Sequence, residues 1–368
     1  MKKSVLFVSY SMGIGGVEKA LLGTIDKFVK DGWEVHLALI KATGEFLNYL
    51  PKNVEVTEIQ DFKVVKPLIH TPMRSTCVQS LKAGCPLFAA RMAYYLLRYK
   101  IEKGAAALYQ YAFSKIPLFS ERVFDLAIAY AGPDAFIDSY VAQKVRAHEK
   151  WGWIHFDISQ FGIDRSIIKK SYRQFSRINI VSREGKEKFD GAFPQFASKT
   201  VHTPNIIDRD LILHMAEEPV NLPDTAAKKI ILTVGRISAE KGQYDAILAF
   251  ESLIKEGIDN LEWWFVGAGS DYERCKQYVC NHGLSDYIRF IGATPNPYPY
   301  MRACDLYVQP SHHEGFCITL AEAKLFGMPI IATDFTGARE QLADYSSPSL
   351  IVNHDPSAIA DAIASLSK

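Results

Sequence analysis

Two glutamates, Glu314 and Glu322, stand eight residues apart in the stretch P-S-H-H-E-G-F-C-I-T-L-A-E. The apolar run 303–309 before them predicts a buried strand, and the periodicity of residues 318–325 predicts a helix after a Gly-Phe turn. The free N–H groups at a helix start, together with the helix dipole, can hold a phosphate. Carboxylates would not bind that phosphate themselves, but they suit sugar hydroxyls on either side of a diphosphate.

This segment resembles the E-x7-E motif of the retaining GT-B glycosyltransferases, glycosyltransferase family 4 in particular. In that family the first glutamate faces the transferred sugar and the second binds the ribose of the nucleotide, so the resemblance implies these roles for Glu314 and Glu322. A bare pair of glutamates at this spacing is more often two solvated charges on a helix face. Here strand, turn, helix and the next strand, at 327–333, come in the family's order. The resemblance further implies a donor-binding turn made of Gly315, Phe316, Cys317, Ile318 and Thr319.

Arg236 and Lys241 stand five residues apart in the loop G-R-I-S-A-E-K-G, directly after a strand predicted at 229–234. Fixed cations there would stabilise the negative charge that a nucleoside diphosphate gains as its bond to the sugar breaks. A lone arginine and lysine are usually solvated surface cations. The loop, however, matches the family's phosphate-binding segment almost residue for residue. The resemblance implies catalytic roles for both cations and a donor-binding role for Gly235.

Near the amino terminus, the run M-G-I-G-G follows an apolar strand predicted at 4–9 and precedes a helical pattern. Gly15 and Gly16 would let the backbone approach a diphosphate closely, and a plain tight turn is the alternative. The run is not the dinucleotide-binding fingerprint, because Glu18 stands where its last glycine should be. We therefore expect no nicotinamide cofactor.

His155 ends the aromatic, strand-like run W-G-W-I-H. From the residues alone, a satisfied core histidine is the favoured interpretation. The family has a histidine here that faces the donor sugar, so the resemblance implies a site role for His155, although not that of a general base.

Strands alternate with helical patterns in both halves of the chain, and glycine-bearing loops follow several strands. This predicts an α/β fold with two Rossmann-like, doubly wound parallel sheets. The resemblance implies the GT-B arrangement, in which two such domains face each other across a cleft. The turn-rich segment H-T-P-N-I-I-D resembles the family's hinge, except that Ile206 replaces a glycine. We expect an acceptor-side domain over 1–205 and a nucleotide-sugar domain over 206–368.

Composition excludes several other functions. The 42 Lys and Arg residues nearly balance 41 Asp and Glu residues, which argues against nucleic-acid binding. Apolar runs are too short for a membrane-spanning helix or a signal peptide, so we expect a cytoplasmic protein. The six cysteines show no C-x-x-C spacing, and the D-R-D at 208–210 follows a turn instead of a core strand. We expect neither a bound metal nor a cofactor.

Residues 62–120 carry nine lysines and arginines against one acid, Glu102, interleaved with tyrosines and phenylalanines. Basic amphipathic helices with aromatic residues are typical of proteins that lie on an anionic bilayer. A helical subdomain whose cations simply face solvent is an equal alternative. The first interpretation would place the protein at the inner face of the cell membrane.

Together these observations predict a retaining hexosyltransferase that uses a nucleotide-diphosphate sugar, with UDP favoured, and no metal. The basic aromatic segment favours a glycan acceptor on a lipid carrier, as in the synthesis of bacterial surface polysaccharides. Two alternatives are a non-catalytic GT-B partner subunit, which typically lacks some of these charged residues, and a GT-B sugar-nucleotide epimerase, which would need no acceptor.

Overall fold

The structure, a computed structural model, describes residues 2–159, 162–222 and 228–366. The chain divides into two compact units. Unit 1 comprises Met1–Gly13, Thr24–Val181 and Lys186–Thr203, and unit 2 comprises Ile14–Gly23, Ser182–Gly185 and Pro204–Lys368. Short segments from the first half of the chain thus belong to unit 2, and the boundary predicted at residues 205 and 206 stays a prediction.

Unit 1 contains a parallel sheet of seven strands in the order β3-β2-β1-β4-β5-β6-β7. The interior strand β1 is buried along its whole length, and it pairs with β2 on one side and β4 on the other. That environment explains the uninterrupted apolar run at the start of the sequence. The strands span Ser4–Ser9 (β1), Glu34–Leu39 (β2), Glu55–Glu58 (β3), Phe124–Gly132 (β4), Ala147–Ile154 (β5), Arg177–Ile180 (β6) and Thr200–His202 (β7).

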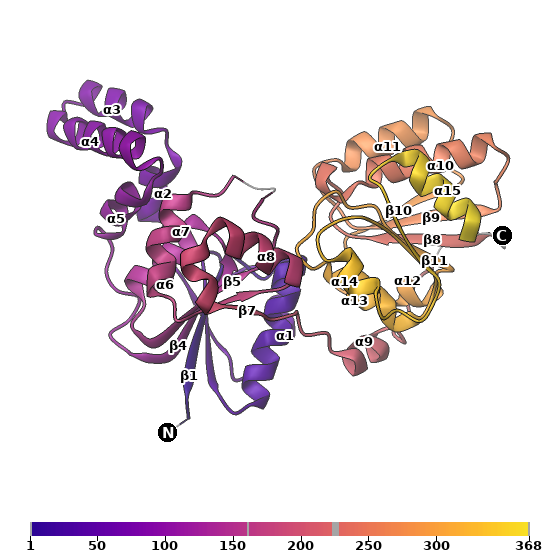
Figure 1. Cartoon of the computed structure of the whole chain (residues 1–368), viewed down its shortest axis with the longest axis horizontal. Coiled ribbons are helices and arrows are strands. Elements are labelled where there is room, and N and C mark those ends of the chain that lie inside the picture. Colours follow the sequence, from indigo (N-terminus) through magenta and orange to yellow (C-terminus); the bar gives the residue numbers. More distant parts are fainter. Residues whose placement is uncertain (1, 160–161, 223–227, 367–368) are drawn as a thin grey trace. The chain divides into compact units, whose positions relative to one another are not determined.

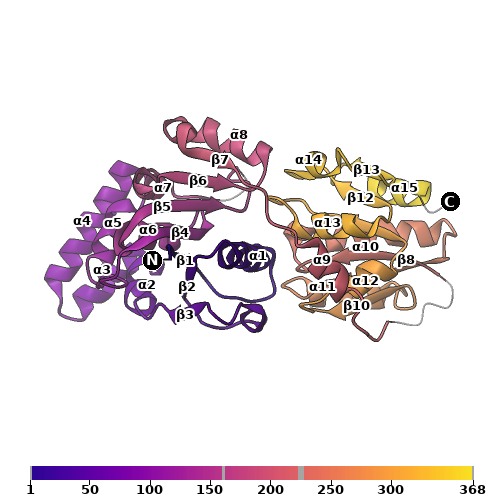
Figure 2. The same ribbon diagram turned by 90° about the horizontal axis from the view of Figure 1, so that it is seen from below.

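Helices cover both faces of this sheet, with α6 and α7 on one side and α1 on the other (Figures 1 and 2). Ser182 caps the helix after β6, because its Oγ accepts a hydrogen bond from the N–H of Gly185 at 3.2 Å. These helices span Gly16–Lys30 (α1), Ala135–Lys144 (α6), Arg165–Ser171 (α7) and Arg183–Ala192 (α8).

Four helices are inserted between β3 and β4. The last of them, α5, is largely buried against the core of unit 1, whereas α3 has no buried residue. Helices α3 and α4 form a hairpin that stands away from the sheet of this unit (Figure 1). The four helices span Phe62–His70 (α2), Met73–Lys82 (α3), Pro86–Glu102 (α4) and Ala106–Phe113 (α5).

Unit 2 contains a second parallel sheet, of six strands in the order β10-β9-β8-β11-β12-β13. The strands span Lys229–Val234 (β8), Leu261–Val266 (β9), Ile288–Gly292 (β10), Leu306–Gln309 (β11), Ile330–Thr333 (β12) and Ser349–Val352 (β13). The helices span Arg209–Met215 (α9), Gln243–Lys255 (α10), Tyr272–Asn281 (α11), Tyr298–Ala303 (α12), Ile318–Ala323 (α13), Ala338–Leu342 (α14) and Pro356–Leu366 (α15).

Each face of the second sheet buries its own hydrophobic cluster. One cluster, with Trp263 and Phe250, lies under α10, α11 and α15, and the other, with Trp264 and Tyr307, lies against α12 and α13. The predicted fold class, two doubly wound parallel sheets, is therefore confirmed. Within the described ranges, no helix is both long enough and apolar enough to span a bilayer.

Candidate active site

The candidate site of unit 2 lies where β8 and β11 end. These strands are neighbours in the sheet, but the chain continues from β8 toward one edge and from β11 toward the other. Such a reversal of strand order opens a crevice at the carboxyl ends, where doubly wound sheets bind ligands. The loop after β8 carries Arg236 and Lys241, and the loop after β11 carries Glu314.

Lys241 and Glu314 form an ion pair, with Nζ 2.7 Å from Oε2, and both side chains are largely buried. Burial by itself lowers the pKa of Lys241, but the charge of Glu314, its hydrogen bond to Lys241 and, to a smaller extent, the charge of Glu240 raise the pKa above its usual value. Lys241 therefore keeps its positive charge at neutral pH. The structure brings together two of the residues that the sequence predicts as catalytic.

Gly242 allows the two loops to approach each other. Its φ is +70°, and a Cβ at this position would lie 2.0 Å from the carbonyl oxygen of Pro310. The backbone N–H groups of His312 and His313 also donate to the carbonyl oxygen of Glu240, at 2.8 and 3.3 Å. The position of Lys241 beside Glu314 thus depends on a backbone contact that only glycine permits.

A chain of hydrogen bonds from hydroxyl and amide groups fixes the orientation of the Glu314 carboxylate. Ser311 Oγ donates to Glu314 Oε1 at 2.8 Å and in turn accepts from Gln309 Nε2 at 2.8 Å. Tyr307 and Thr319 hydroxyls both donate to Gln309 Oε1, at 2.7 and 3.2 Å. Each oxygen of the Glu314 carboxylate therefore has a defined partner, Ser311 on one side and Lys241 on the other.

Arg236 differs from Lys241 because its side chain is 66% exposed. Its Nη2 contacts Glu240 Oε1, four residues further along the same loop. The guanidinium therefore keeps donors in contact with solvent at the mouth of the loop. Gly235, directly before it, lies next to Gly267, where a Cβ would come within 1.9 Å of the Gly235 carbonyl oxygen.

The predicted donor-binding turn connects β11 to α13. Cys317 adopts a left-handed conformation, with φ +56°, and its buried thiol has a pKa raised well above the usual value by burial and by the Glu314 charge. Its carbonyl oxygen accepts from Gln341 Nε2 at 3.3 Å. Gly315, Ile318 and Cys317 are buried, and the rest of the turn is half-buried, namely Phe316 and Thr319.

The helix after this turn is shorter than the predicted 318–325. It ends at Ala323 and continues as a short 3-10 turn over Lys324–Phe326, because Gly327, with φ +75°, and the following Pro329 stop it.

Glu322 lies buried one turn into α13. Its Oε1 accepts a hydrogen bond from the Tyr298 hydroxyl at 3.0 Å, and Lys19, in the same compact unit, places Nζ 2.8 Å from that oxygen. Burial and the Glu322 charge raise the pKa of Tyr298. Glu322 Oε2 has no hydrogen-bond partner among the described residues. A buried carboxylate oxygen without a partner is costly unless a ligand supplies a donor.

The glycine turn before α1 also belongs to unit 2. A Cβ on Gly15 would lie 2.3 Å from Glu18 Oε2, so the Glu18 carboxylate folds over this turn. Burial raises the pKa of Glu18. At Gly16, by contrast, a Cβ would meet no atom within 4 Å, so packing does not require a glycine there.

His155 lies in unit 1, directly after β5, and the structure does not place it with the charged residues of unit 2. Its ring packs against Tyr130, with centroids 4.6 Å apart, and it is buried. Burial lowers its pKa to about 3, so the imidazole is neutral at physiological pH. Its Nε2 has no partner among the described side chains and backbone.

Several site residues were not apparent from the sequence. Ser311 and Gln309 position Glu314, and Tyr298 positions Glu322, but nothing in their spacing distinguishes them from ordinary strand and helix residues. The run Q-P-S at the carboxyl end of β11 gives a weak signal. It places two polar side chains at the end of a buried strand, and buried polar groups need hydrogen-bond partners.

The remaining candidates from the sequence have structural roles. Asp208 caps α9 by accepting from the N–H of Leu211 at 3.0 Å, which explains the D-R-D match. Across 2–159, 162–222 and 228–366, no group of three or more His, Cys, Asp or Glu residues is arranged to hold a metal ion.

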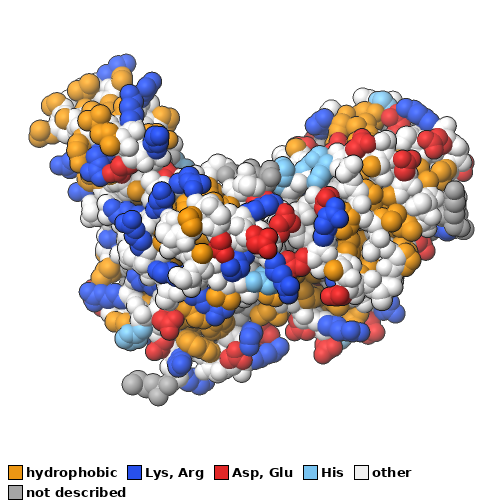
Figure 3. All heavy atoms as spheres, viewed as in Figure 1, with side chains coloured by type: hydrophobic (Ala, Val, Ile, Leu, Met, Phe, Trp, Pro, Cys, Tyr) orange, Lys and Arg blue, Asp and Glu red, His pale blue; other side chains and the backbone are white. Residues whose placement is uncertain are grey.

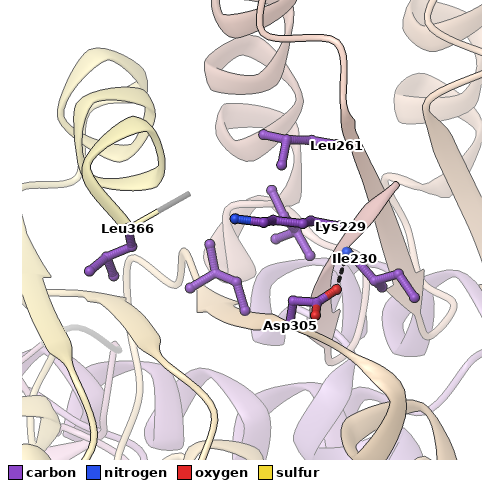
Figure 4. A pocket seen from close by; sticks show the side chains of 7 residues that line it. Lys229, Ile230, Leu261, Asp305 and Leu366 are labelled. Carbon is purple, nitrogen blue, oxygen red and sulfur yellow. Dashed lines mark hydrogen bonds between the residues drawn. The ribbon is translucent and has the colours of Figure 1, made fainter. Parts of the chain in front are cut away.

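A small pocket lies at the opposite end of the second sheet (Figure 4). Lys229 and Leu261, at the amino ends of β8 and β9, line it together with Leu366, and the N–H of Ile230 donates to Asp305 there at 2.7 Å. Because ligands of such sheets bind at the carboxyl ends, this pocket is separate from the candidate site.

Residues 216–368 match the family model described as glycosyl transferases group 1. The chain is 29% identical over 169 residues to a poly(glycerol-phosphate) alpha-glucosyltransferase of Bacillus subtilis, which covers 45% of this chain and 24% of that protein. It is 33% identical over 148 residues to the lipopolysaccharide core mannosyltransferase LpsB of Rhizobium meliloti, covering 38% of this chain and 41% of that protein. The chain thus spans less than half the length of these curated relatives.

Among solved structures, HepE of Anabaena, in complex with UDP and glucose, superposes with a TM-score of 0.68. The match covers 99% of this chain and 89% of HepE at 21% identity, which is evidence for the fold alone. With its two parallel-sheet units, of seven and six strands, the chain has the GT-B fold.

Proposed function

We propose that this chain is a retaining glycosyltransferase of glycosyltransferase family 4. It would transfer a hexose from a nucleotide-diphosphate sugar, with a UDP-sugar favoured, to the hydroxyl of a glycan acceptor. The match to the group 1 family model and the glycosyltransferase relatives support the general class. The observation that carries the proposal is the Lys241–Glu314 pair beside Arg236, at the carboxyl ends of β8 and β11.

The charges of these loops fit a diphosphate leaving group. In the proposed reaction the bond between the anomeric carbon and the β-phosphate oxygen breaks, and negative charge grows on the phosphate. Lys241 keeps its charge, and Arg236 presents exposed donors at the loop's mouth. Fixed cations that meet charge as it develops lower the barrier more than they strengthen ground-state binding.

The two glutamates would bind the two sugars of the donor. Glu314 is held by Ser311 and Lys241, so it can accept hydrogen bonds from the transferred hexose in a fixed orientation. Glu322 has a buried oxygen with no donor among the described residues, which suits a ribose hydroxyl. The turn Gly315–Thr319, with Gly15, Gly16 and Gly235, would contact the rest of the nucleotide.

The acceptor oxygen would bond to the anomeric carbon on the face that the phosphate leaves, and its proton would pass to the departing phosphate. Retention of configuration follows from this front-face attack. His155, being neutral, would offer the sugar a hydrogen bond and not a charge. The mechanism uses residues of the chain and the donor's own phosphate as the base.

The acceptor is proposed to be a bacterial surface glycan or its lipid-linked precursor, made in the cytoplasm at the inner membrane face. Two relatives, a poly(glycerol-phosphate) glucosyltransferase and a lipopolysaccharide core mannosyltransferase, act on such polymers by name. HepE, which shares the fold, was solved with UDP-glucose, which supports the choice of a UDP-sugar.

Calorimetry with UDP tests the two assignments separately. Glu322→Gln should weaken UDP binding, whereas Glu314→Gln should preserve UDP binding and lower sugar transfer. Glu262→Gln is the matched control, because Glu262 is also buried and bonded to an aromatic donor, Trp264 Nε1, but lies on β9 near its amino end. Equal losses of UDP affinity in the first two variants would overturn the assigned roles.

Release of UDP from UDP-sugars, measured with and without acceptor, tests the reaction itself. Transfer predicts release that rises with acceptor and a product whose anomeric proton keeps the donor configuration by NMR. Release of free sugar without any acceptor would indicate an epimerase-type reaction, and no release from any nucleotide sugar would indicate a non-catalytic subunit.

A further inference from the structure

The outward face of α4 is apolar although it faces solvent. Residues seven apart lie on the same side of a helix, and those three further along lie beside them. On α4 these positions hold Leu87, Tyr94 and Ile101, with Leu97 next to them, and their exposed fractions are 87%, 50%, 68% and 57%. The stripe therefore runs along the whole helix.

The opposite face of α4 is the one that packs within unit 1. Ala89 and Met92 are buried there. Tyr95 stacks on Tyr111 of α5, with ring centroids 5.0 Å apart, and Cys77 of α3 approaches the carbonyl oxygen of Ala89. Because this face satisfies the packing of the hairpin, the apolar outward stripe is not needed to hold α4 in place.

Cations surround this stripe. Figure 3 shows hydrophobic and cationic side chains side by side over the hairpin. Arg98 is partly neutralised by an ion pair with Glu102, the one acid among residues 62–120, and Arg91 lies over the ring of Tyr111. Four further cations on α3, on α4 and at their ends are exposed, namely Arg74, Lys82, Lys100 and Lys103.

We propose that the outward face of the α3–α4 hairpin docks on an anionic lipid bilayer. Exposed aliphatic and tyrosine side chains would enter the interface, while the lysines and arginines would contact lipid phosphates. Charge decides between this occupant and a second copy of the chain. Two copies meeting through the outward face of α4 would bring Arg91 and Arg98 against the same cations, and Glu102 is the one acid of that helix to compensate.

If the proposed function is correct, the enzyme would meet a lipid-linked acceptor at this surface. The test of the surface itself needs no catalysis. The full chain should sediment with phosphatidylglycerol vesicles at about 50 mM salt, where charge screening is weak. Binding to phosphatidylcholine vesicles should be much weaker, and added salt should release the protein.

Two sets of variants separate the apolar and ionic contributions. Leu87→Ser with Ile101→Ser should lower the vesicle partition coefficient at least about tenfold, since each side chain loses most of its transfer from water. Val123→Ser with Leu222→Ser is the matched control, because both residues are exposed aliphatics outside the hairpin, and it should bind as the parent does. Replacement of Arg74, Lys82, Lys100 and Lys103 by Gln should lower binding about 100-fold or more, because each contributes roughly fivefold.

All variants should bind UDP like the parent chain, which shows that they fold and keeps the two proposals distinguishable. A parent that ignores phosphatidylglycerol vesicles, or hairpin variants that bind as well as the parent, would overturn the docking surface. So would a dimer in sedimentation velocity that Leu87→Ser with Ile101→Ser converts to monomer. Vesicle binding without UDP binding would leave the surface intact and contradict the proposed function.

Discussion

Lys241 in unit 2 and His155 in unit 1 both follow a parallel strand and are largely buried, but they differ in charge. In unit 2, the loops after β8 and β11 hold charged side chains in contact, with Lys241 2.7 Å from Glu314. In unit 1, β5 ends beside His155, which is buried, neutral and unpaired at Nε2 within the described part of the chain. The strand end in unit 2 thus depends on an ion pair, whereas the histidine at the end of β5 is neutral and the Asp157–Lys188 ion pair of unit 1 follows two residues further on.

The surroundings of Lys241 and His155 determine the protonation state of each side chain. Contact with Glu314 lets Lys241 keep its charge despite burial, because the carboxylate offsets the desolvation of the ammonium group and raises its pKa. Burial lowers the pKa of His155 by more than its backbone hydrogen bond with Tyr130 raises it, so the imidazole is neutral. Of these two side chains, only Lys241 would therefore supply positive charge to the proposed diphosphate, and three substitutions test this contrast.

The largest effect is expected for Lys241→Ala. Loss of one charge-assisted contact to a diphosphate should lower turnover about 100-fold, or about 2.7 kcal/mol in the barrier. The variant should also be less stable, because Glu314 remains buried without its partner. Steady-state kinetics and urea unfolding measure the two effects.

Lys255→Ala provides the control for Lys241→Ala. Lys255 forms an ion pair with Glu251 at the far end of α10, but it is well exposed, so stability should change by less than about 0.5 kcal/mol and turnover not at all. In the double variant Lys241→Ala with Glu314→Gln, stability should recover while turnover stays low. Recovery of turnover would mean that Lys241 serves only to neutralise Glu314.

Gly242→Ala should have the next largest effect. Its φ of +70° disfavours any side chain, and the new Cβ would press on the Pro310 carbonyl oxygen at 2.0 Å. Gly257→Ala has a similar φ, +84°, but meets nothing within 4 Å. Both substitutions share a cost of roughly 1 kcal/mol for a side chain in the left-handed conformation. Beyond that shared cost, Gly242→Ala should lower the free energy of unfolding by about 2 kcal/mol more than Gly257→Ala does. Equal stabilities would mean that the two loops separate at little cost.

The sequence predicted the strands of this site better than its contacts. Residues 4–9 and 229–234 form β1 and β8 as predicted, because a central parallel strand needs an unbroken apolar run. The resemblance implied roles for Lys241 and Glu314 at a donor site, but their contact was not predicted. The role of Ser311 could not be predicted, because its hydrogen-bond partner depends on how the loop folds back. The exposure of the α4 stripe could not be predicted either, because it depends on which face of α4 packs against α5.

The smallest effect concerns His155 and pH. Its pKa is about 3 in the folded chain and about 6.5 when exposed, so between these values the unfolded chain binds a proton that the folded chain does not. Stability therefore falls as pH drops below about 6.5, by about 1.4 kcal/mol per pH unit. Between pH 7.5 and 5.5 the parent should lose about 1.4 kcal/mol more than His155→Gln, as measured by urea unfolding at both pH values.

His148→Gln is the control, because His148 lies on the same strand but is exposed, and it should keep the parent's pH dependence. All other titrating groups are common to the three proteins, so their contributions cancel in the comparison. If the parent and His155→Gln lost equal stability between the two pH values, His155 would be able to take up a proton in the folded state. His155 could then carry a positive charge at the end of β5, and the contrast between a charged Lys241 and a neutral His155 would no longer hold.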